Sequence, residues 1–70
     1  MSEPERATIR LDQFMKYVGL TESGGQAKHA IQAGEVLVNG GVETRRSRKL
    51  HAGDRVTFAG RTEVVTLQED

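Results

Sequence analysis

The fold of this chain is decided by the stretch GEVLVNGGVET, residues 34–44. Before Gly34 the apolar residues recur every three or four positions, and after it they alternate with a period of two. This change indicates a switch from helix to strand. Asn39-Gly40-Gly41 is the strongest turn signal in the chain, because Asn and Gly tolerate positive φ. The stretch therefore predicts two short strands, residues 35–38 and 42–44, joined by a tight turn.

A first amphipathic helix is predicted over about residues 11–18, with Ile9 packing just before it. Gly19 is suited to the C′ position that ends a helix. The apolar residues that fit this helical spacing are Leu11, Phe14, Met15 and Val18.

A second, shorter helix is predicted over about residues 24–33. Ser23 at the N-cap, with Gln26 three residues later, forms a capping-box pattern, and Gly34 can end the helix. Its apolar positions are Ala27, Ala30 and Ile31. Only residues 19–22 separate the two helices, so we expect a compact helical hairpin or corner.

The segment after the hairpin predicts two further strands. Residues 45–49 contain no apolar side chain and are expected to form a solvated loop or a ragged sheet edge, with Leu50 as the next core candidate. Residues 55–58 alternate as a strand with Val56 and Phe58 on one face. A last strand is expected to carry Val64, Val65 and Leu67. The fold class is therefore α+β, with a two-helix corner packed on a small, mostly antiparallel β-sheet.

The length and composition exclude several classes of protein. Seventy residues allow one domain, expected over residues 9–68 after a flexible tail of residues 1–8. The absence of cysteine excludes a disulfide scaffold and a thiolate nucleophile. No apolar run approaches the ~20 residues of a membrane span, and the acidic N-terminus is not a secretory signal, so we expect a cytoplasmic protein.

Catalysis is not expected either. The chain offers no nucleophile–base pair, and a deep pocket would consume most of so small a core. His29 and His51 are not spaced as metal ligands. We therefore expect neither an enzyme nor a bound cofactor or metal.

The net charge of zero conceals an uneven distribution. Residues 10–58 carry eight basic and five acidic side chains, a net charge of +3, whereas residues 1–9 and 59–70 together carry −3. The field near a surface follows local charge, because exposed charges beyond ~8–10 Å are largely screened. Overall neutrality therefore does not argue against a nucleic-acid partner.

The densest charge lies at residues 45–49, where four cations fall within five residues and no acid lies among them. They are Arg45, Arg46, Arg48 and Lys49. These cations would repel each other unless an anion is near, and the arginine fork matches phosphate oxygens in a bidentate fashion. A solvated loop that keeps a sheet edge from pairing with other chains would carry the same charges. The residues alone leave both interpretations open.

The start of the second helix is another candidate anion site. Its first N–H groups have no intrahelical partner, and Ser23-Gly24-Gly25 allows a phosphate to approach the backbone closely. Capping alone accounts for Ser23. The glycine pair costs about 1 kcal/mol per residue against alanine inside a helix, so either a phosphate or tight packing of this helix has to explain it. Lys28 and His29 follow on the polar face.

An ordered series of these residues resembles the S4-like RNA-binding domain. Its most specific parts are Gly34-x-Val36-x-Val38-Asn39-Gly40 and Gly53-Asp54-x-Val56. The helical positions that agree are Leu11, Asp12, Phe14, Gly19, Leu20, Ser23, Ala27 and Ile31. The stretches at residues 21–28 and 41–46 look closer still to tiny stand-alone bacterial S4-like proteins described as ribosome-associated. The resemblance covers about residues 9–58.

This resemblance implies a helix–helix corner of the αL type packed on a small sheet. It places the RNA surface on the two helices and the following strand loop, and it implies no catalysis by the module. Arg10 matches a basic residue common at the start of S4 domains. One departure stands out: many S4 domains carry Arg directly after the Ser that starts the second helix, and this chain has Gly24 there.

We therefore expect a monomeric protein that binds ribosomal or other structured RNA by backbone and shape recognition. Phe14 and Phe58 are expected in the core. Tyr17 could stack on a base, but one ring is not a stacking platform of the kind that single-strand binders use. The expected phosphate contacts are Arg10, Lys16, Lys28, His29, Arg45, Arg46, Arg48 and Lys49, with backbone donors at Ser23, Gly24 and Gly25. Two alternatives stay open: a protein-interaction adaptor, and a non-catalytic accessory to an RNA-modifying or ribosome-assembly factor.

Overall fold

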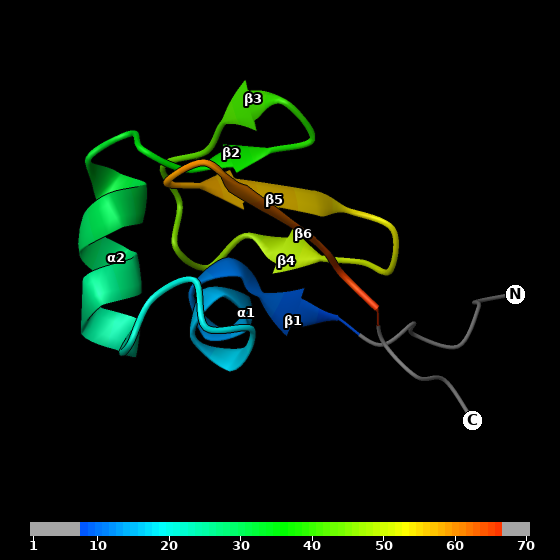
Figure 1. Cartoon of the computed structure of the whole chain (residues 1–70), viewed down its shortest axis with the longest axis horizontal. Coiled ribbons are helices and arrows are strands. Elements are labelled where there is room, and N and C mark those ends of the chain that lie inside the picture. The colour runs from blue at the N-terminus through cyan, green and yellow to red at the C-terminus, as the bar shows by residue number, and fades with distance from the viewer. Residues whose placement is uncertain (1–7, 67–70) are drawn as a thin grey trace, which may run out of the picture.

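Two helices and six short strands follow one another in the computed structural model, which describes residues 8–66 (Figure 1). Their order is β1 (Ile9–Arg10), α1 (Leu11–Tyr17), α2 (Gly24–Gln32), β2 (Leu37–Val38), β3 (Gly41–Val42), β4 (Lys49–Leu50), β5 (Arg55–Phe58) and β6 (Arg61–Val64). The two predicted helices precede the hairpin and the later strands, as expected, but the short strand β1 comes before them. The tail predicted for residues 1–8 lies outside the described residues except for Thr8, and so does Leu67.

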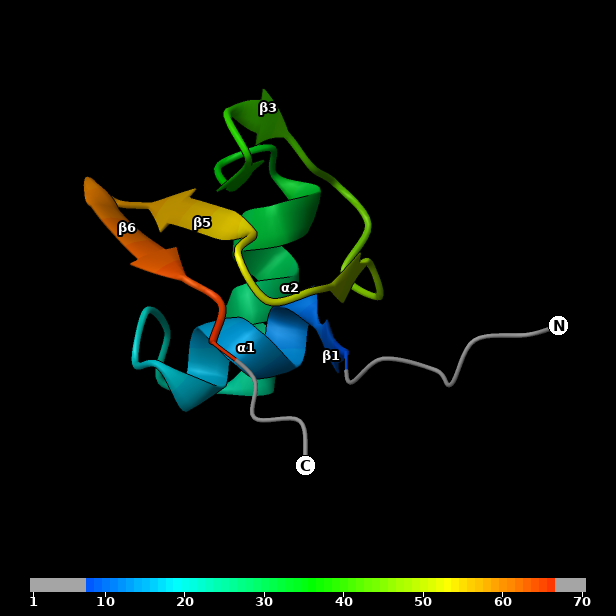
Figure 2. The ribbon, with the colours of Figure 1, turned by 90° about the vertical axis from the view of Figure 1, so that its right-hand side faces the viewer.

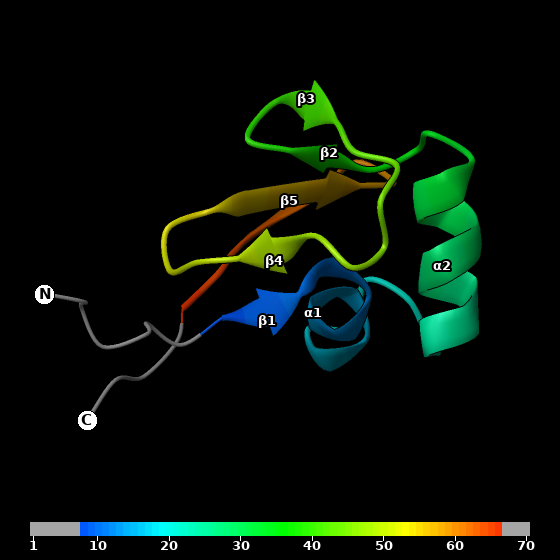
Figure 3. The same ribbon diagram turned by 180° about the vertical axis from the view of Figure 1, so that it is seen from behind.

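The strands form two antiparallel sheets. Strands β3-β2-β5-β6 lie side by side in the larger one, with Leu37 opposite both Val42 and Thr57. The smaller sheet pairs β1 with β4, and Figure 3 shows this pair beside α1. This second sheet was not predicted, because strands of two residues are too short for an alternating pattern to show in the sequence.

The core lies between the two helices and the strands. Helices α1 and α2 contact each other closely, as the small residues of α2 allow, and α2 stands at one end of the strands (Figure 1). The buried apolar residues are Leu11, Phe14, Met15, Ala27, Ala30, Ile31, Val36, Val38, Leu50, Val56 and Val65. Phe58 was expected in the core and is only partly buried, packed against its rim.

Both helices end where glycine was expected. Helix α1 stops at Tyr17, and Gly19 follows at φ +79°. Helix α2 stops at Gln32, and Gly34 follows at φ +80°. Glycine adopts this left-handed region without the steric cost of a Cβ, so each helix ends in a compact turn.

The sequence misplaced the bounds of several strands: the hairpin strands, expected over residues 35–38 and 42–44, run over Leu37–Val38 and Gly41–Val42. The last strand was placed wrongly as well. It was expected to carry Val64, Val65 and Leu67, and it runs over Arg61–Val64 instead. The turn between β5 and β6 has only two residues, Ala59 and Gly60, so β6 begins at Arg61, which lies opposite Phe58. Val65 then leaves the strand: its N–H donates to Asp54 and its carbonyl accepts from Gly53. Val65 is buried against the core from that position.

Candidate nucleic-acid interface

The basic loop, residues 43–48, closes onto the start of α1. Arg10 at the N-cap provides no side-chain cap for this helix. The N–H of Leu11 instead donates to the carbonyl of Arg48 at 2.8 Å, and that of Asp12 to the carbonyl of Arg46 at 3.2 Å. Since the first N–H groups of a helix need partners from outside, these two bonds fix the loop against α1.

This arrangement gathers five cations from two distant parts of the sequence. Lys49 lies opposite Arg10 in the β1–β4 pair, and the loop leads into Lys49. We call the five residues the basic surface: Arg10, Arg45, Arg46, Arg48 and Lys49. Figure 2 shows β4 and its loop on one side of the molecule and β6 on the other.

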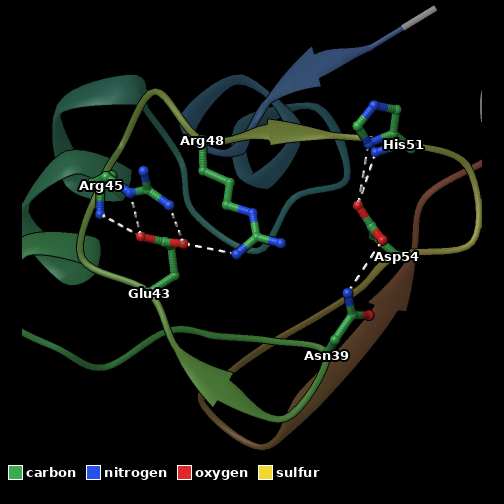
Figure 4. Close-up of polar contacts among 6 residues, drawn as sticks. All are labelled: Asn39, Glu43, Arg45, Arg48, His51 and Asp54. Carbon is green, nitrogen blue, oxygen red and sulfur yellow. Dashed lines mark hydrogen bonds and ion pairs between the residues drawn. The ribbon is translucent and has the colours of Figure 1, made fainter. Parts of the chain in front are cut away.

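The carboxylate of Glu43 holds the loop together from the inside (Figure 4). It accepts a hydrogen bond from Arg48 Nη1 at 2.8 Å, from Arg45 Nε at 3.2 Å and from the Arg45 backbone N–H at 3.0 Å. The residue is 7% exposed. The side-chain bonds from Arg45 and Arg48, and the Arg45 N–H, lower the pKa of Glu43 from 4.5 to about 2.

Glu43 revises the interpretation of the four clustered cations. The sequence pattern required an anion near them, which pointed to an RNA phosphate. For Arg45 and Arg48 the structure supplies that anion from within the chain. The available signal was a single acid, in the strand predicted over residues 42–44, two positions before the run of arginines. The sequence could not show that its side chain turns inward.

The cations of the basic surface differ in how freely they can meet a ligand. Arg10 pairs with Asp12, Nε to Oδ1 at 3.1 Å and Nη2 to Oδ2 at 3.2 Å. Arg45 remains largely exposed despite its ion pair. Arg46 and Lys49 are exposed and make no ion pair with any residue of the described segment 8–66. These two side chains present the least compensated charge.

The start of α2 shows the predicted capping box. Ser23 Oγ accepts the Gln26 N–H at 3.1 Å, and Gln26 Oε1 accepts the Glu22 N–H at 2.7 Å. A Cβ at Gly24 would meet no atom within 4 Å, and one at Gly25 only Ser23 Oγ at 3.9 Å. Tight packing therefore does not explain the glycine pair.

The remaining candidates lie on other parts of the two helices. Lys28 and His29 are exposed on α2, as expected. Lys16 is exposed in the last turn of α1, at the opposite end of that helix from Arg10. Among residues 8–66 no hydrogen bond or ion pair links Lys16, Lys28 or His29 to the basic surface.

The two most specific stretches of the sequence meet in space (Figure 4). Asn39 Nδ2 donates to Asp54 Oδ1 at 3.2 Å, and Asn39 Oδ1 accepts the Arg55 N–H at 2.9 Å. The other Asp54 oxygen accepts the His51 N–H at 2.8 Å. These bonds lock the β2–β3 turn to the turn before β5, so Asn39 and Asp54 are structural residues.

Two further properties bear on the site. Within residues 8–66, no group of three or more His, Asp or Glu side chains is arranged to hold a metal ion. No helix in the same segment is long and apolar enough to cross a membrane.

Comparison with known proteins identifies the family. The family model described as the S4 domain matches residues 3–66. The chain belongs to the S4 domain family. An Escherichia coli relative named "Putative RNA-binding protein YbcJ" is 50% identical over 52 residues, 74% of each chain. A Bacillus subtilis relative named "Probable ribosome maturation protein RlbA" is 46% identical over 52 residues, 74% of this chain and 73% of its own.

Two solved structures share the fold of this S4 domain protein. The solution structure of Escherichia coli YbcJ, described as revealing an αL motif involved in RNA binding, aligns with TM-score 0.66 and 41% identity over 94% of this chain and 82% of its own. The trimeric Heat Shock Protein 15 of Vibrio cholerae aligns with TM-score 0.76 and 19% identity, over 91% of this chain and 68% of its own. The predicted α+β class and αL-type corner are confirmed.

Proposed function

We propose that this S4 domain protein binds structured RNA, above all ribosomal RNA. It binds by neutralising backbone phosphates and catalyses no reaction. The observation that carries the proposal is the basic surface. Backbone bonds from Leu11 and Asp12 hold its loop on α1, and Glu43 holds it from within. Arg45 and Arg48, held by Glu43, lose less conformational entropy when they meet a ligand than free side chains would.

The five cations would take different parts in binding. Arg46 and Lys49 are exposed and supply the principal phosphate contacts. Arg45 and Arg48 keep donors beyond those that Glu43 uses, so each can add a contact from a preset position. Arg10 lies beside Lys49 and extends the same surface.

The start of α2 would contribute a second, weaker contact. The open space over Gly24 and Gly25 leaves room for a phosphate oxygen at the start of the helix, where Ser23 already caps the Gln26 N–H. Lys28 and His29 continue from that point along the exposed face of α2, and Lys16 lies on α1. This contact would align the RNA across both helices.

The names of two relatives support the choice of partner. YbcJ is named for RNA binding and RlbA for ribosome maturation, and both match about three quarters of this chain. We therefore extend the proposal to an accessory role at the ribosome, which would act in the cytoplasm and as a monomer. Crosslinking in cells followed by sequencing of the bound RNA identifies the target.

A salt titration of RNA binding tests the proposal. Engagement of about four or five phosphates gives a log–log slope of roughly −3 to −4 against salt concentration. An affinity that is insensitive to salt contradicts phosphate binding. Capture of partners from a lysate, with and without nuclease, separates this function from that of a protein adaptor, because partners that survive nuclease favour the adaptor.

A further inference from the structure

An exposed aromatic side chain on α1 is not used by the phosphate contacts above. Tyr17 is 82% exposed, the highest value among the large hydrophobic residues of the described segment. It shares one face of α1 with Gln13 and Lys16, since residues three and four positions apart are neighbours on a helix. The opposite face, with Leu11, Phe14 and Met15, is buried.

Tyr17 borders an open hollow on the surface. The hollow has a volume of about 470 Å³ and is lined by Ile9, Gln13, Lys16 and Tyr17. Its walls combine an aliphatic side chain, an aromatic ring, an amide and an ammonium group. A flat, polar-edged ring with a negatively charged backbone fits that combination better than an aliphatic peptide segment does.

The strand β1 and the helix α1 connect the hollow to the basic surface. Ile9, which lines it, is followed directly by Arg10, and this strand pairs with Lys49 and Leu50. The loop carbonyls of Arg46 and Arg48 bond to the first turn of the same helix. From Leu11 to Tyr17 the helix rises about 9 Å, so an RNA strand held by the basic surface can place a neighbouring nucleotide over Tyr17.

We infer that Tyr17 stacks on an unpaired base of the bound RNA, with Lys16 facing the adjoining phosphate and the Gln13 amide facing the edge of the base. This inference rests on the proposed RNA binding and adds a preference for RNA that exposes an unpaired base. Stacking is tolerant of sequence, because every base has an aromatic face. A tyrosine ring also loses little conformational entropy when it is fixed.

The charges around Tyr17 favour RNA over a second copy of the chain or a protein partner. Lys16 lines the hollow itself. A second hollow of about 620 Å³ shares Ile9 and Tyr17 with the first and is otherwise lined by Phe14, Val18, Glu63, Val64 and Thr66. Glu63 is engaged by Arg61 at 2.7 Å, which lowers its repulsion of a phosphate.

The composition of the chain provides a direct test. Tyr17 is the single tyrosine and the chain has no tryptophan, so tyrosine fluorescence reports on this side chain alone. A single-stranded oligouridylate and a blunt-ended RNA duplex are titrated into the full chain in parallel at low salt. We expect fluorescence to be quenched as the single strand saturates and to stay unchanged with the duplex.

Three variants separate stacking from other roles. Tyr17→Ala should weaken binding of the single strand by roughly five- to hundredfold and leave binding of the duplex unchanged. Tyr17→Phe keeps the ring and should bind within about twofold of the wild type, since stacking does not need the hydroxyl. Tyr17→Leu keeps an apolar side chain without the ring and should behave as Tyr17→Ala.

Each other outcome overturns the inference. If the single strand saturates without quenching, or if Tyr17→Ala keeps full affinity, no base stacks on Tyr17. The proposed phosphate binding would then still stand. An equal loss for single strand and duplex shows a role in folding or positioning only. Concentration-dependent self-association that Tyr17→Ala abolishes assigns the face to a second copy. If neither RNA binds, the proposed function itself fails.

Discussion

Glu43 and Arg48 lie five residues apart and are joined by a hydrogen bond of 2.8 Å between Oε1 and Nη1. The same carboxylate holds the side chain and backbone of Arg45. The loop that bears the clustered cations is therefore built around a nearly buried acid. An acid in this position gives the loop a defined shape and leaves a net positive charge on its outer side.

Replacement of Glu43 by Gln should destabilise the fold. Glutamine offers one acceptor oxygen and no charge, so Arg48 and Arg45 lose their charge-assisted bonds. We expect the free energy of unfolding to fall by about 1–2 kcal/mol, a range reduced for the exposure of Arg45. Urea denaturation at neutral pH measures it.

A matched control is available on the other side of the molecule. Glu63 is bonded to Arg61 at 2.7 Å at a partly exposed position. Because such surface pairs contribute little, Glu63→Gln should cost less than about 0.5 kcal/mol. If both variants lost the same free energy of unfolding, Glu43 would contribute no more than a surface ion pair does.

Acid should remove the contribution of Glu43 to stability. The pKa of Glu43 is about 2 in the folded protein against 4.5 otherwise, so the unfolded chain binds the proton first as pH falls. The stabilisation is complete above pH 4.5 and is lost as the pH falls towards 2. Asp54 acts in the same direction: burial raises its pKa, but bonds from the His51 N–H and Asn39 outweigh this and lower it.

Urea midpoints measured across this range of pH check the assignment. The wild type should lose stability between pH 4.5 and about 2, and Glu43→Gln should lose less over the same interval. A variant whose midpoint falls as steeply as that of the wild type would mean that other carboxyl groups dominate the acid response.

Ala59 offers a site where one substitution should stabilise the protein. Ala59 and Asn39 both lie at φ +53°, each followed by a glycine in a two-residue hairpin turn. Asparagine tolerates this region better than alanine does. Ala59→Asn should raise the free energy of unfolding by about 0.5–1 kcal/mol, measured by urea denaturation.

Asn39→Ala is the reciprocal control. It places alanine at positive φ and also removes the side-chain bonds to Asp54 and the Arg55 N–H. Its loss of stability should therefore exceed the gain at Ala59. A stability unchanged by Ala59→Asn would show that this turn relaxes to a different conformation.

Gly24→Arg should strengthen RNA binding. A side chain at Gly24 meets open space, and this substitution introduces the arginine that many S4 domains carry there. One added phosphate contact should steepen the log–log salt slope by ~0.7–0.9.

Gly24→Ala is the matched control, because it removes the same glycine without adding charge. If Gly24→Arg and Gly24→Ala have the same salt slope and the same affinity, the start of α2 lies outside the RNA surface. The two variants should differ slightly in stability as well, since a cation at a helix N-terminus is unfavourable by a few tenths of a kcal/mol.

Much of the fold was predictable because the decisive signals are local. The change of period at Gly34 and the Asn39-Gly40 turn fix the transition from helices to sheet, and Ser23 with Gln26 fixes the start of α2. The pairing of β1 with β4 was not predictable, since it joins residues about forty positions apart through two-residue strands. Only part of the candidate site could be predicted from the sequence, for the same reason.

The sequence showed which cations cluster, but it did not show which contacts hold them in position. Glu43 lies two residues before Arg45, and nothing local shows that its carboxylate turns under the loop. The capping of α1 by the carbonyls of Arg46 and Arg48 depends on the path of the whole chain between α1 and β4. Tyr17 was identified as an isolated ring, and only the structure shows that it lines a hollow together with Ile9, Gln13 and Lys16.

The central claim is that Arg46 and Lys49 on the loop meet phosphates, and a salt titration of the double variant Arg46→Ala/Lys49→Ala tests it most directly. The wild-type slope should be roughly −3 to −4, and that of the double variant shallower by ~1.4. The paired variant Arg61→Ala/Glu63→Gln removes both partners of an ion pair in β6, the strand that Figure 2 shows on the far side of the molecule from β4, and should leave the slope unchanged. A double variant with the wild-type slope and affinity would contradict the account.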